Sequence, residues 1–246
     1  MRISWSEIFA NTDILSPIDR ETWQVIGETC KITAASHVLE LASGKGAFAL
    51  YLASKFGCCV DCYEQNADFV DYSVKRARDQ GLESLVKFTG SRVEDIEVNS
   101  GKYDLGVCLG ALYLFREAGW RVLWKGVKPG GYLAISDLFC TRTPPPRDLM
   151  EVFFEEEGEA LTLDDARARY VERGLKIVCE EECSRAAWLS YYDLTKEMFQ
   201  GLAEKSQNDE ERQREIAEAM REDRLVREYG KEYLGYMTFI MQKPRG

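Results

Sequence analysis

Residues 38–53 constrain the fold of this chain more than any other stretch. They read V-L-E-L-A-S-G-K-G-A-F-A-L-Y-L-A, which is a short apolar run, an acid, a loop of small residues and a helical apolar pattern. This order predicts a β-strand, a tight loop and an α-helix. The loop glycines, Gly44 and Gly46, lack a Cβ atom and let backbone approach a ligand closely, and the next helix begins with free N–H groups.

A second acid stands at the end of the next predicted strand. Residues 58–64 form another apolar run, and Glu64 follows Glu40 by 24 positions (64 − 40). An acid about 20 residues beyond a glycine loop can accept hydrogen bonds from the two hydroxyls of a ribose. NAD and an adenosyl ligand both carry a ribose. The loop lacks the G-x-G-x-x-G spacing that cradles a pyrophosphate, and Glu40 would repel phosphates but could bind an ammonium group.

Two further motifs follow in order. Residues 102–113 contain a predicted strand that begins K-Y-D-L, and residues 127–137 begin V-K-P-G-G and continue as another strand. Together with the glycine loop and the second acid, these motifs resemble the class I S-adenosylmethionine-dependent methyltransferases over roughly residues 36–139. Within that family the chain resembles the small-molecule methyltransferases of type 11. The segments that carry this narrower resemblance are residues 110–113 (G-A-L-Y), 136–139 (S-D-L-F) with the prolines at 145–146, and 188–192 (W-L-S-Y-Y).

The resemblance implies an α/β fold and a single domain over residues 1–246. The expected core is a Rossmann-like, seven-stranded, mostly parallel sheet with helices on both faces and a helical cap over the carboxyl ends of the strands. We expect an N-terminal helical cap in residues 1–30, the cofactor-binding core in 31–140, and the remaining strands with helical substrate-cap insertions in 141–246.

The resemblance also implies roles for individual residues. Glu40 would orient the methionine ammonium of S-adenosylmethionine, and Glu64 would hold its ribose hydroxyls. Arg92 stands where the family often has an aspartate beside the adenine. The full set of expected cofactor residues is Glu40, Ala42, Ser43, Gly44, Gly46, Glu64, Gln65, Arg92, Val93 and Leu109.

The methyl acceptor is expected to be a small molecule over the carboxyl ends of the strands. Its covering segments would be residues 1–30, 140–160 and 185–230. The aromatic residues predicted to line its pocket are Trp5, Tyr113, Trp188, Tyr191 and Tyr192. Such rings can favour a cationic acceptor by cation–π contact, although each could equally pack in the core.

No catalytic base is evident in the sequence, and Tyr113 and Tyr192 are the candidates for a hydroxyl near the acceptor. The single histidine, His37, precedes the first strand and is predicted to lie on the surface at the wrong end for chemistry. Alignment of a nucleophilic acceptor with the sulfonium can suffice. Two other classes stay open: a protein that binds S-adenosylmethionine without turnover, and an NAD-dependent dehydrogenase, which the loop disfavours.

The eight cysteines raise the question of a metal or metalloid site. In C-C-V-D-C, strand alternation would send Cys58 and Cys62 to one face and Cys59 to the other, which favours core thiols. Cys179 and Cys183 are too far apart for a second C-x-x-C pair. We therefore predict no metal, with an arsenite-type methyltransferase that uses clustered thiols, including Cys140, as the alternative.

Composition agrees with a globular protein. The net charge of −10, from 42 acidic and 32 basic residues, argues against nucleic acid as a partner. Acidic runs at residues 151–159 and 180–182 are expected to be solvated surface, or to give a weak preference for cationic substrates. No apolar stretch approaches the ~20 residues of a membrane span, and the first residues do not resemble a signal peptide. We expect a cytoplasmic monomer or weak homodimer that does not bind membranes.

The remaining pattern gives a coarse map of elements. Helices are expected at residues 19–30, 66–80, 115–127, 162–173 and 207–228, and further strands at 85–90, 174–180 and 233–242. Asn66 and Thr162 are predicted helix N-caps, and Gly81 is a predicted helix stop. The prolines at 144–146 mark a break in regular structure.

Overall fold

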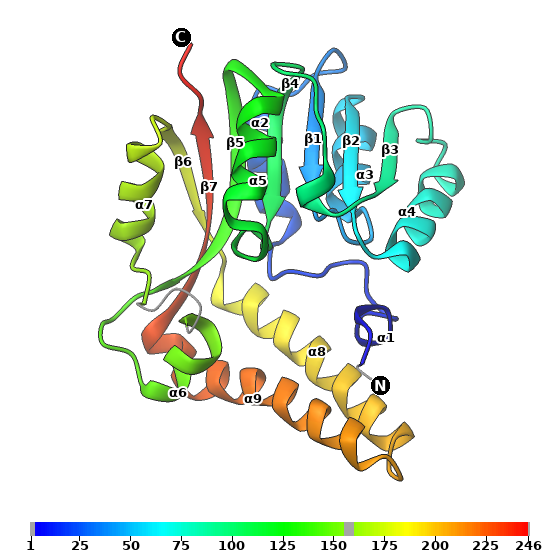
Figure 1. Cartoon of the computed structure of the whole chain (residues 1–246), viewed down its shortest axis with the longest axis vertical. Helices are drawn as coiled ribbons and strands as arrows, with labels where there is room; N and C mark the ends of the chain where they lie inside the picture. Colours follow the sequence, from blue (N-terminus) through cyan, green and yellow to red (C-terminus); the bar gives the residue numbers. More distant parts are fainter. Residues whose placement is uncertain (1–2, 155–159, 246) are drawn as a thin grey trace.

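The computed structural model describes residues 3–154 and 160–245, which form a seven-stranded sheet in the order β3-β2-β1-β4-β5-β7-β6 (Figure 1). Strands β1 to β5 pair in parallel, and β7 lies antiparallel between β5 and β6. The strands are β1 (His37–Leu41), β2 (Cys59–Glu64), β3 (Val86–Gly90), β4 (Tyr103–Leu109), β5 (Val127–Cys140), β6 (Lys176–Glu182) and β7 (Leu234–Gln242). The predicted Rossmann-like, mostly parallel sheet is confirmed.

Helices cover both faces of this sheet. The helices are α1 (Trp5–Ile8), α2 (Arg20–Thr29), α3 (Ala47–Phe56), α4 (Ala67–Asp79), η1 (Val93–Asp95), α5 (Leu112–Gly126), α6 (Arg147–Leu149), η2 (Met150–Phe154), α7 (Leu163–Glu172), α8 (Arg185–Lys205) and α9 (Glu210–Tyr233). Buried side chains of α2, α3 and α4 share one core cluster, and those of α5 and α7 share the other. Figure 1 shows α5 in front of the sheet and α2 and α3 behind it.

Because both faces are covered, the central strands are mostly apolar. Val38 and Leu39 in β1 are both fully buried, but Val38 belongs to one core cluster and Leu39 to the other. Because β1 to β5 run parallel, their carboxyl ends meet at a single edge of the sheet. Polar residues lie at this edge, at or just after the ends of the buried strands.

The long helices α8 and α9 pack on each other beyond this edge, and α1 packs on α8 (Figure 1). This arrangement matches the helical cap that the sequence analysis expected from residues 185–230. Helix α2 differs from the expected N-terminal cap, since it packs against α3, β6 and β7 as part of the sheet layers. The division of the chain at residues 30 and 140 otherwise stays a prediction.

Local signals placed most helix ends correctly. The Asn66 side chain accepts hydrogen bonds from the Asp68 and Phe69 N–H groups at the start of α4. Thr162 and Asp165 form a reciprocal capping box at the start of α7. Helix α5 begins at Leu112, three residues before the predicted start, and the predicted 207–228 helix runs instead over residues 210–233. Of the acidic run 151–159, residues 155–159 lie outside the described residues.

No helix within the described ranges combines the length and the apolarity that a membrane span requires.

Candidate active site

A cavity of about 720 Å³ lies where β1, β2, β4 and β5 end, between the sheet and the cap. Its walls combine the loop after β1, the end of β2, the 91–93 segment, the N-terminal residues and helices α8 and α9. We call the part formed by Glu40, residues 42–46 and Glu64 the cofactor half. The part walled by Trp188, Tyr191, Tyr192 and Tyr236 is called the acceptor half.

The loop of the cofactor half has an unusual backbone. Ala42, Gly44 and Gly46 all adopt positive φ angles, of 52°, 54° and 70°. Left-handed backbone costs a residue with a Cβ atom about 1–2 kcal/mol, so Ala42 is strained where the family has glycine. A Cβ atom on Gly46 would come within 2.5 Å of the Phe88 ring. The loop therefore depends on glycine both for conformation and for packing.

Glu64 connects this loop to helix α4. Its Oε2 accepts a hydrogen bond from the Gly44 N–H at 2.9 Å, and its Oε1 accepts one from the Asn66 N–H at 2.8 Å. Each carboxylate oxygen has two lone pairs, so both oxygens can accept a further hydrogen bond. The arrangement suits a pair of neighbouring hydroxyls, as in a ribose.

Glu40 is buried at the tip of β1, and the Cys62 thiol donates a weak hydrogen bond to its Oε2 at 3.7 Å. Burial raises the pKa of Glu40 to about 8; the Cys62 contact lowers the pKa somewhat and the charge of Glu64 raises it. A cation bound beside Glu40 would favour its charged form. This carboxyl group therefore fits an ammonium ligand.

The Ser43 hydroxyl also points to a ligand site in this half. Its hydroxyl oxygen is buried, lines the cavity and has no hydrogen-bond partner within the described part of the chain. An unsatisfied buried polar group costs about 1–3 kcal/mol. The orphan hydroxyl, the two carboxylates and the glycine loop together fit a ligand with amino acid and ribose parts.

The N-terminal segment, residues 3–18, covers this half and is fixed by Lys45. The buried Lys45 Nζ donates hydrogen bonds to the carbonyl oxygens of Phe9 at 2.5 Å and Thr12 at 2.9 Å. Asp13 in the same segment accepts a hydrogen bond from the Tyr72 hydroxyl at 2.7 Å and pairs with Arg76 at 3.0 Å. The sequence analysis missed Lys45, although a lysine between two loop glycines is an available signal.

The same segment also contacts the cap. The Tyr191 hydroxyl donates a hydrogen bond to the Leu15 carbonyl at 3.3 Å, the Ile3 N–H donates one to Glu215 at 3.0 Å, and Glu7 pairs with Arg212. Residues 3–18 therefore join the sheet to the cap across the cavity.

Aromatic side chains dominate the acceptor half. Trp188 and Tyr192 are buried, and the Tyr191 and Tyr192 rings pack edge to face at 5.4 Å. The Tyr192 hydroxyl donates a hydrogen bond to Glu222 Oε1 at 2.6 Å, so this candidate hydroxyl already has a carboxylate partner.

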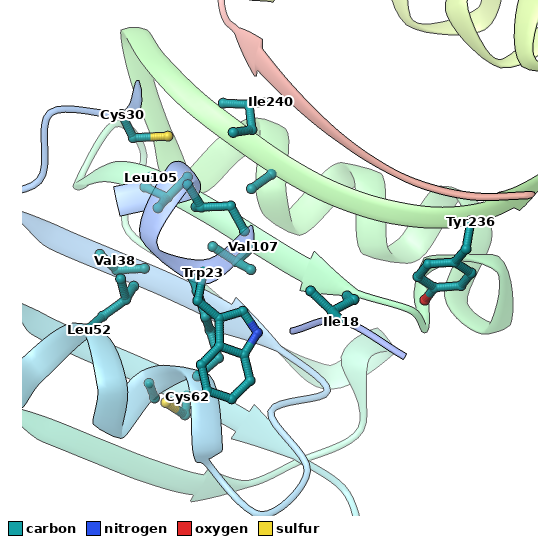
Figure 2. Close-up of a cluster of buried hydrophobic side chains, with 14 of the residues drawn as sticks. Ile18, Trp23, Cys30, Val38, Leu52, Cys62, Leu105, Val107, Tyr236 and Ile240 are labelled. Atoms are coloured by element: carbon teal, nitrogen blue, oxygen red, sulfur yellow. The ribbon is translucent and has the colours of Figure 1, made fainter. Parts of the chain in front are cut away.

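Tyr236 completes this wall from β7, beside the end of β4 (Figure 2). A Cβ atom built on Gly110, the residue after β4, would lie 2.3 Å from the Tyr236 hydroxyl oxygen. Gly110 therefore leaves the space in which this hydroxyl sits. The sequence analysis missed Tyr236 and Glu222 because neither belongs to a local motif.

Most residues predicted for the site line the cavity. The set comprises Trp5, Glu40, Ala42, Ser43, Gly44, Glu64, Gln65, Val93, Leu109, Tyr113, Trp188, Tyr191 and Tyr192. Gly46 lies behind this wall and shapes the loop. Arg92 is outside the cavity, because its exposed side chain points to Glu94 at 3.5 Å while Ser91 and Val93 line the wall instead.

Other sequence predictions concern chemistry away from this cavity. His37 is exposed and begins β1, at the opposite end from the site. All eight cysteines are free thiols, and Cys58 and Cys62 are buried while Cys59 is half-buried. Within the described residues, no group of three or more His, Cys, Asp and Glu side chains could hold a metal ion. The thiols therefore do not form the cluster that the metalloid alternative requires.

Comparison with known proteins gives the family. The profile of the family described as "Methyltransferase domain" matches residues 38–131, which contain the loop, both acids and strand β4. Residues 38–131 match a methyltransferase domain. The resemblance expected from the sequence is thereby confirmed, while the narrower type 11 group stays a prediction.

Solved structures of low identity share the methyltransferase fold. A SAM-dependent methyltransferase from Geobacter sulfurreducens, in complex with S-adenosyl-L-homocysteine, is 21% identical with a TM-score of 0.85, and 96% of each chain is covered. A second, from Thiobacillus denitrificans, is 20% identical with a TM-score of 0.84, covering 98% of this methyltransferase and 99% of the other.

Curated relatives are also distant. The Escherichia coli protein YjhP, described as uncharacterized, is 21% identical over 182 residues, which are 72% of this chain and 73% of YjhP. A sarcosine/dimethylglycine N-methyltransferase from Halorhodospira halochloris is 30% identical over only 70 residues, which are 28% of this methyltransferase and 25% of the relative.

Proposed function

We propose that this methyltransferase transfers the methyl group of S-adenosylmethionine to a small-molecule acceptor bound in the acceptor half. The observation that supports this proposal is the continuity of the cavity, which is lined both by Glu40 and Glu64 and by Trp188 and Tyr192. A cofactor held by the two acids would present its reactive group toward the aromatic wall.

S-adenosylmethionine supplies a sulfonium-bound methyl group that a nucleophile can take. In the proposed reaction Glu40 binds the ammonium and Glu64 binds the ribose. Leu109 and Gly110, at the end of β4, contribute backbone and packing beside the reacting centre. The aromatic wall orients the acceptor and excludes water. Holding the reacting atoms about 3–3.5 Å apart removes much of the entropic barrier to methyl transfer.

The cellular setting belongs to the same proposal. We place the protein in the cytoplasm, as a monomer or weak homodimer. The eight free thiols suit a reducing compartment, and the excess of acidic over basic residues disfavours nucleic acid as a partner.

Thermal melting tests the proposal. S-adenosylmethionine and S-adenosylhomocysteine should each raise the melting temperature, because a ligand that binds only the folded state stabilises it. NAD should leave the melting temperature unchanged. A shift with NAD and none with either adenosyl ligand would contradict the proposal.

Turnover requires a second measurement. Incubation with S-adenosylmethionine and an acceptor library should release S-adenosylhomocysteine, detected by mass spectrometry. A melting shift without any release across the library would favour a protein that binds the cofactor without methyl transfer.

A further inference from the structure

We propose that the methyl acceptor is an amine whose ammonium form is recognised by Glu222 within the aromatic wall. This inference rests on the proposed function, and it names the chemical class of the substrate.

The cavity wall is strongly acidic. Among the described residues that line it, seven are Asp or Glu, and the single base is Arg169. An anionic acceptor would meet more carboxylates than bases along this wall, and like charges repel each other. A cationic acceptor would instead be attracted.

Most of these carboxylates already have other roles. Glu40 and Glu64 belong to the cofactor half. Asp13 pairs with Arg76 at 3.0 Å, Asp223 pairs with Arg227 at 2.7 Å, and Glu151 pairs with Arg221 at 3.1 Å. Asp137 accepts a hydrogen bond from the Leu138 N–H at 2.9 Å.

Glu222 stands apart from the other carboxylates. Within residues 3–154 and 160–245, no Lys, Arg or His side chain pairs with it, and its carboxylate accepts a hydrogen bond from the Tyr192 hydroxyl. The side chain is accessible to solvent and lines the cavity, yet surrounding protein desolvates it enough to raise the pKa of its carboxyl group. It is therefore a carboxylate within reach of a ligand that lacks a counter-ion.

The rings around Glu222 complete a site for an organic cation. The Tyr192 hydroxyl donates its hydrogen bond to Oε1 of Glu222, so Oε2 of Glu222 can accept a hydrogen bond from a ligand. Trp188, Tyr191 and Tyr236 lie in the same wall, and the Trp188 and Tyr236 ring centres are 6.3 Å apart. Aromatic faces attract ammonium groups by about 0.5–2 kcal/mol, and they also pack against an apolar body. Carboxylate and rings together suit an amine that carries an apolar substituent.

An amine must lose a proton before it can attack. In the proposed step the ammonium N–H proton passes to the Glu222 carboxylate, which leaves a neutral nitrogen with a lone pair. That lone pair forms the new N–C bond to the methyl group while the S–C bond breaks and its electron pair goes to sulfur. The products are the N-methylated ammonium ion and S-adenosylhomocysteine, and Glu222 then releases its proton to solvent.

Calorimetric titration of protein saturated with S-adenosylhomocysteine tests this proposal. Each probe carries a phenyl ring on a short alkyl chain, and the probes differ in the polar group at the end of that chain. They are phenethyltrimethylammonium (a quaternary ammonium ion), 3-phenylpropanol (an alcohol) and 4-phenylbutanoate (a carboxylate). We expect the quaternary ammonium ion to bind at least 10-fold more tightly than the alcohol, with the carboxylate weakest. Glu222→Gln should abolish that preference and leave binding of the alcohol unchanged. The secondary amine of the same skeleton should be N-methylated when S-adenosylmethionine is supplied.

Glu211→Gln is the matched control, because Glu211 is an exposed carboxylate on the same helix, α9, and does not line the cavity. Equal effects of the two substitutions would overturn the inference. Alcohol binding as tight as ammonium binding would overturn it too, as would the failure of every ammonium probe to bind. Loss of S-adenosylhomocysteine binding by the unmodified protein would instead contradict the proposed function.

Discussion

The two halves of the cavity are built in different ways. The cofactor half comes from a few short stretches at adjacent strand ends, chiefly residues 40–46 and 64–66, and the backbone defines much of it. The acceptor half brings together residues as distant in sequence as Trp188 on α8, Glu222 on α9 and Tyr236 on β7. Backbone geometry thus shapes the proposed cofactor site, while side chains of α8, α9 and β7 shape the proposed acceptor site.

The two halves also differ in how they are connected to the rest of the fold. The positive φ angle of Ala42 and the hydrogen bond from Gly44 to Glu64 couple the cofactor half to the fold itself. In the acceptor half, Tyr192 and Glu222 bond to each other on the two cap helices. Substitutions there can alter the acceptor without disturbing the sheet, which is a general property of sites placed on covering segments.

The largest expected effect comes from Glu64→Ala, which tests whether the two halves are separable. Loss of charge-assisted hydrogen bonds to the ribose should cost at least about 2 kcal/mol, or roughly 30-fold in affinity for S-adenosylhomocysteine. Calorimetry measures this change directly. Glu222→Gln in the acceptor half should leave the same affinity within about twofold. If both substitutions weakened S-adenosylhomocysteine binding equally, the two halves of the cavity would not be separable.

A smaller effect is expected from Lys45→Met, which releases the N-terminal segment from the loop. The carbonyl oxygens of Phe9 and Thr12 would lose their buried donor, so the free energy of unfolding should fall by about 2 kcal/mol. Urea denaturation measures the fall, and limited proteolysis should cut residues 9–15 faster. Lys55→Met, at an exposed position in the last turn of α3, is the control. The role assigned to Lys45 is refuted if the two variants match.

The smallest effect, taken per pH unit, is a pH dependence caused by Glu40. Its pKa is about 8 in the folded protein, against an ordinary value of 4.5. Between these pH values the folded state holds a proton that the unfolded state lacks, so the free energy of unfolding should fall as pH rises. The slope should reach at most about 1.4 kcal/mol per pH unit and should vanish above about pH 8.

Urea denaturation without ligand between pH 5 and 9 measures this slope. Glu40→Gln should remove the Glu40 contribution, while Glu83→Gln, at an exposed position, should retain it. Parallel profiles for the two variants would mean that Glu40 is charged in the unliganded protein.

The sequence predicted most of the sheet and most of the residues that line the cofactor half of the cavity, because both follow local rules. The apolar run before Glu40, the loop glycines and the cap residue Asn66 each determine structure within a few positions. Glu64 was found because the spacing between successive parallel strands is regular. Arg92 lies outside the cavity wall, while its neighbours Ser91 and Val93, on either side of it at the start of η1, line that wall.

The acceptor half was predicted only in part. Trp188, Tyr191 and Tyr192 were recognisable as an aromatic run on one covering segment. Glu222 and Tyr236 carry no such signal, because their importance comes from packing between α8, α9 and β7 that no local pattern encodes. Lys45 was overlooked because its partners are carbonyl oxygens about 35 residues earlier in the chain.

The N-terminal segment has a consequence for the order of events in a catalytic cycle. Because residues 3–18 touch the loop through Lys45 and the cap through Tyr191, one covering element serves both halves. Displacement of this segment would uncover both halves. On the proposed function, the dissociation rate of S-adenosylhomocysteine should therefore depend on whether the acceptor half is filled.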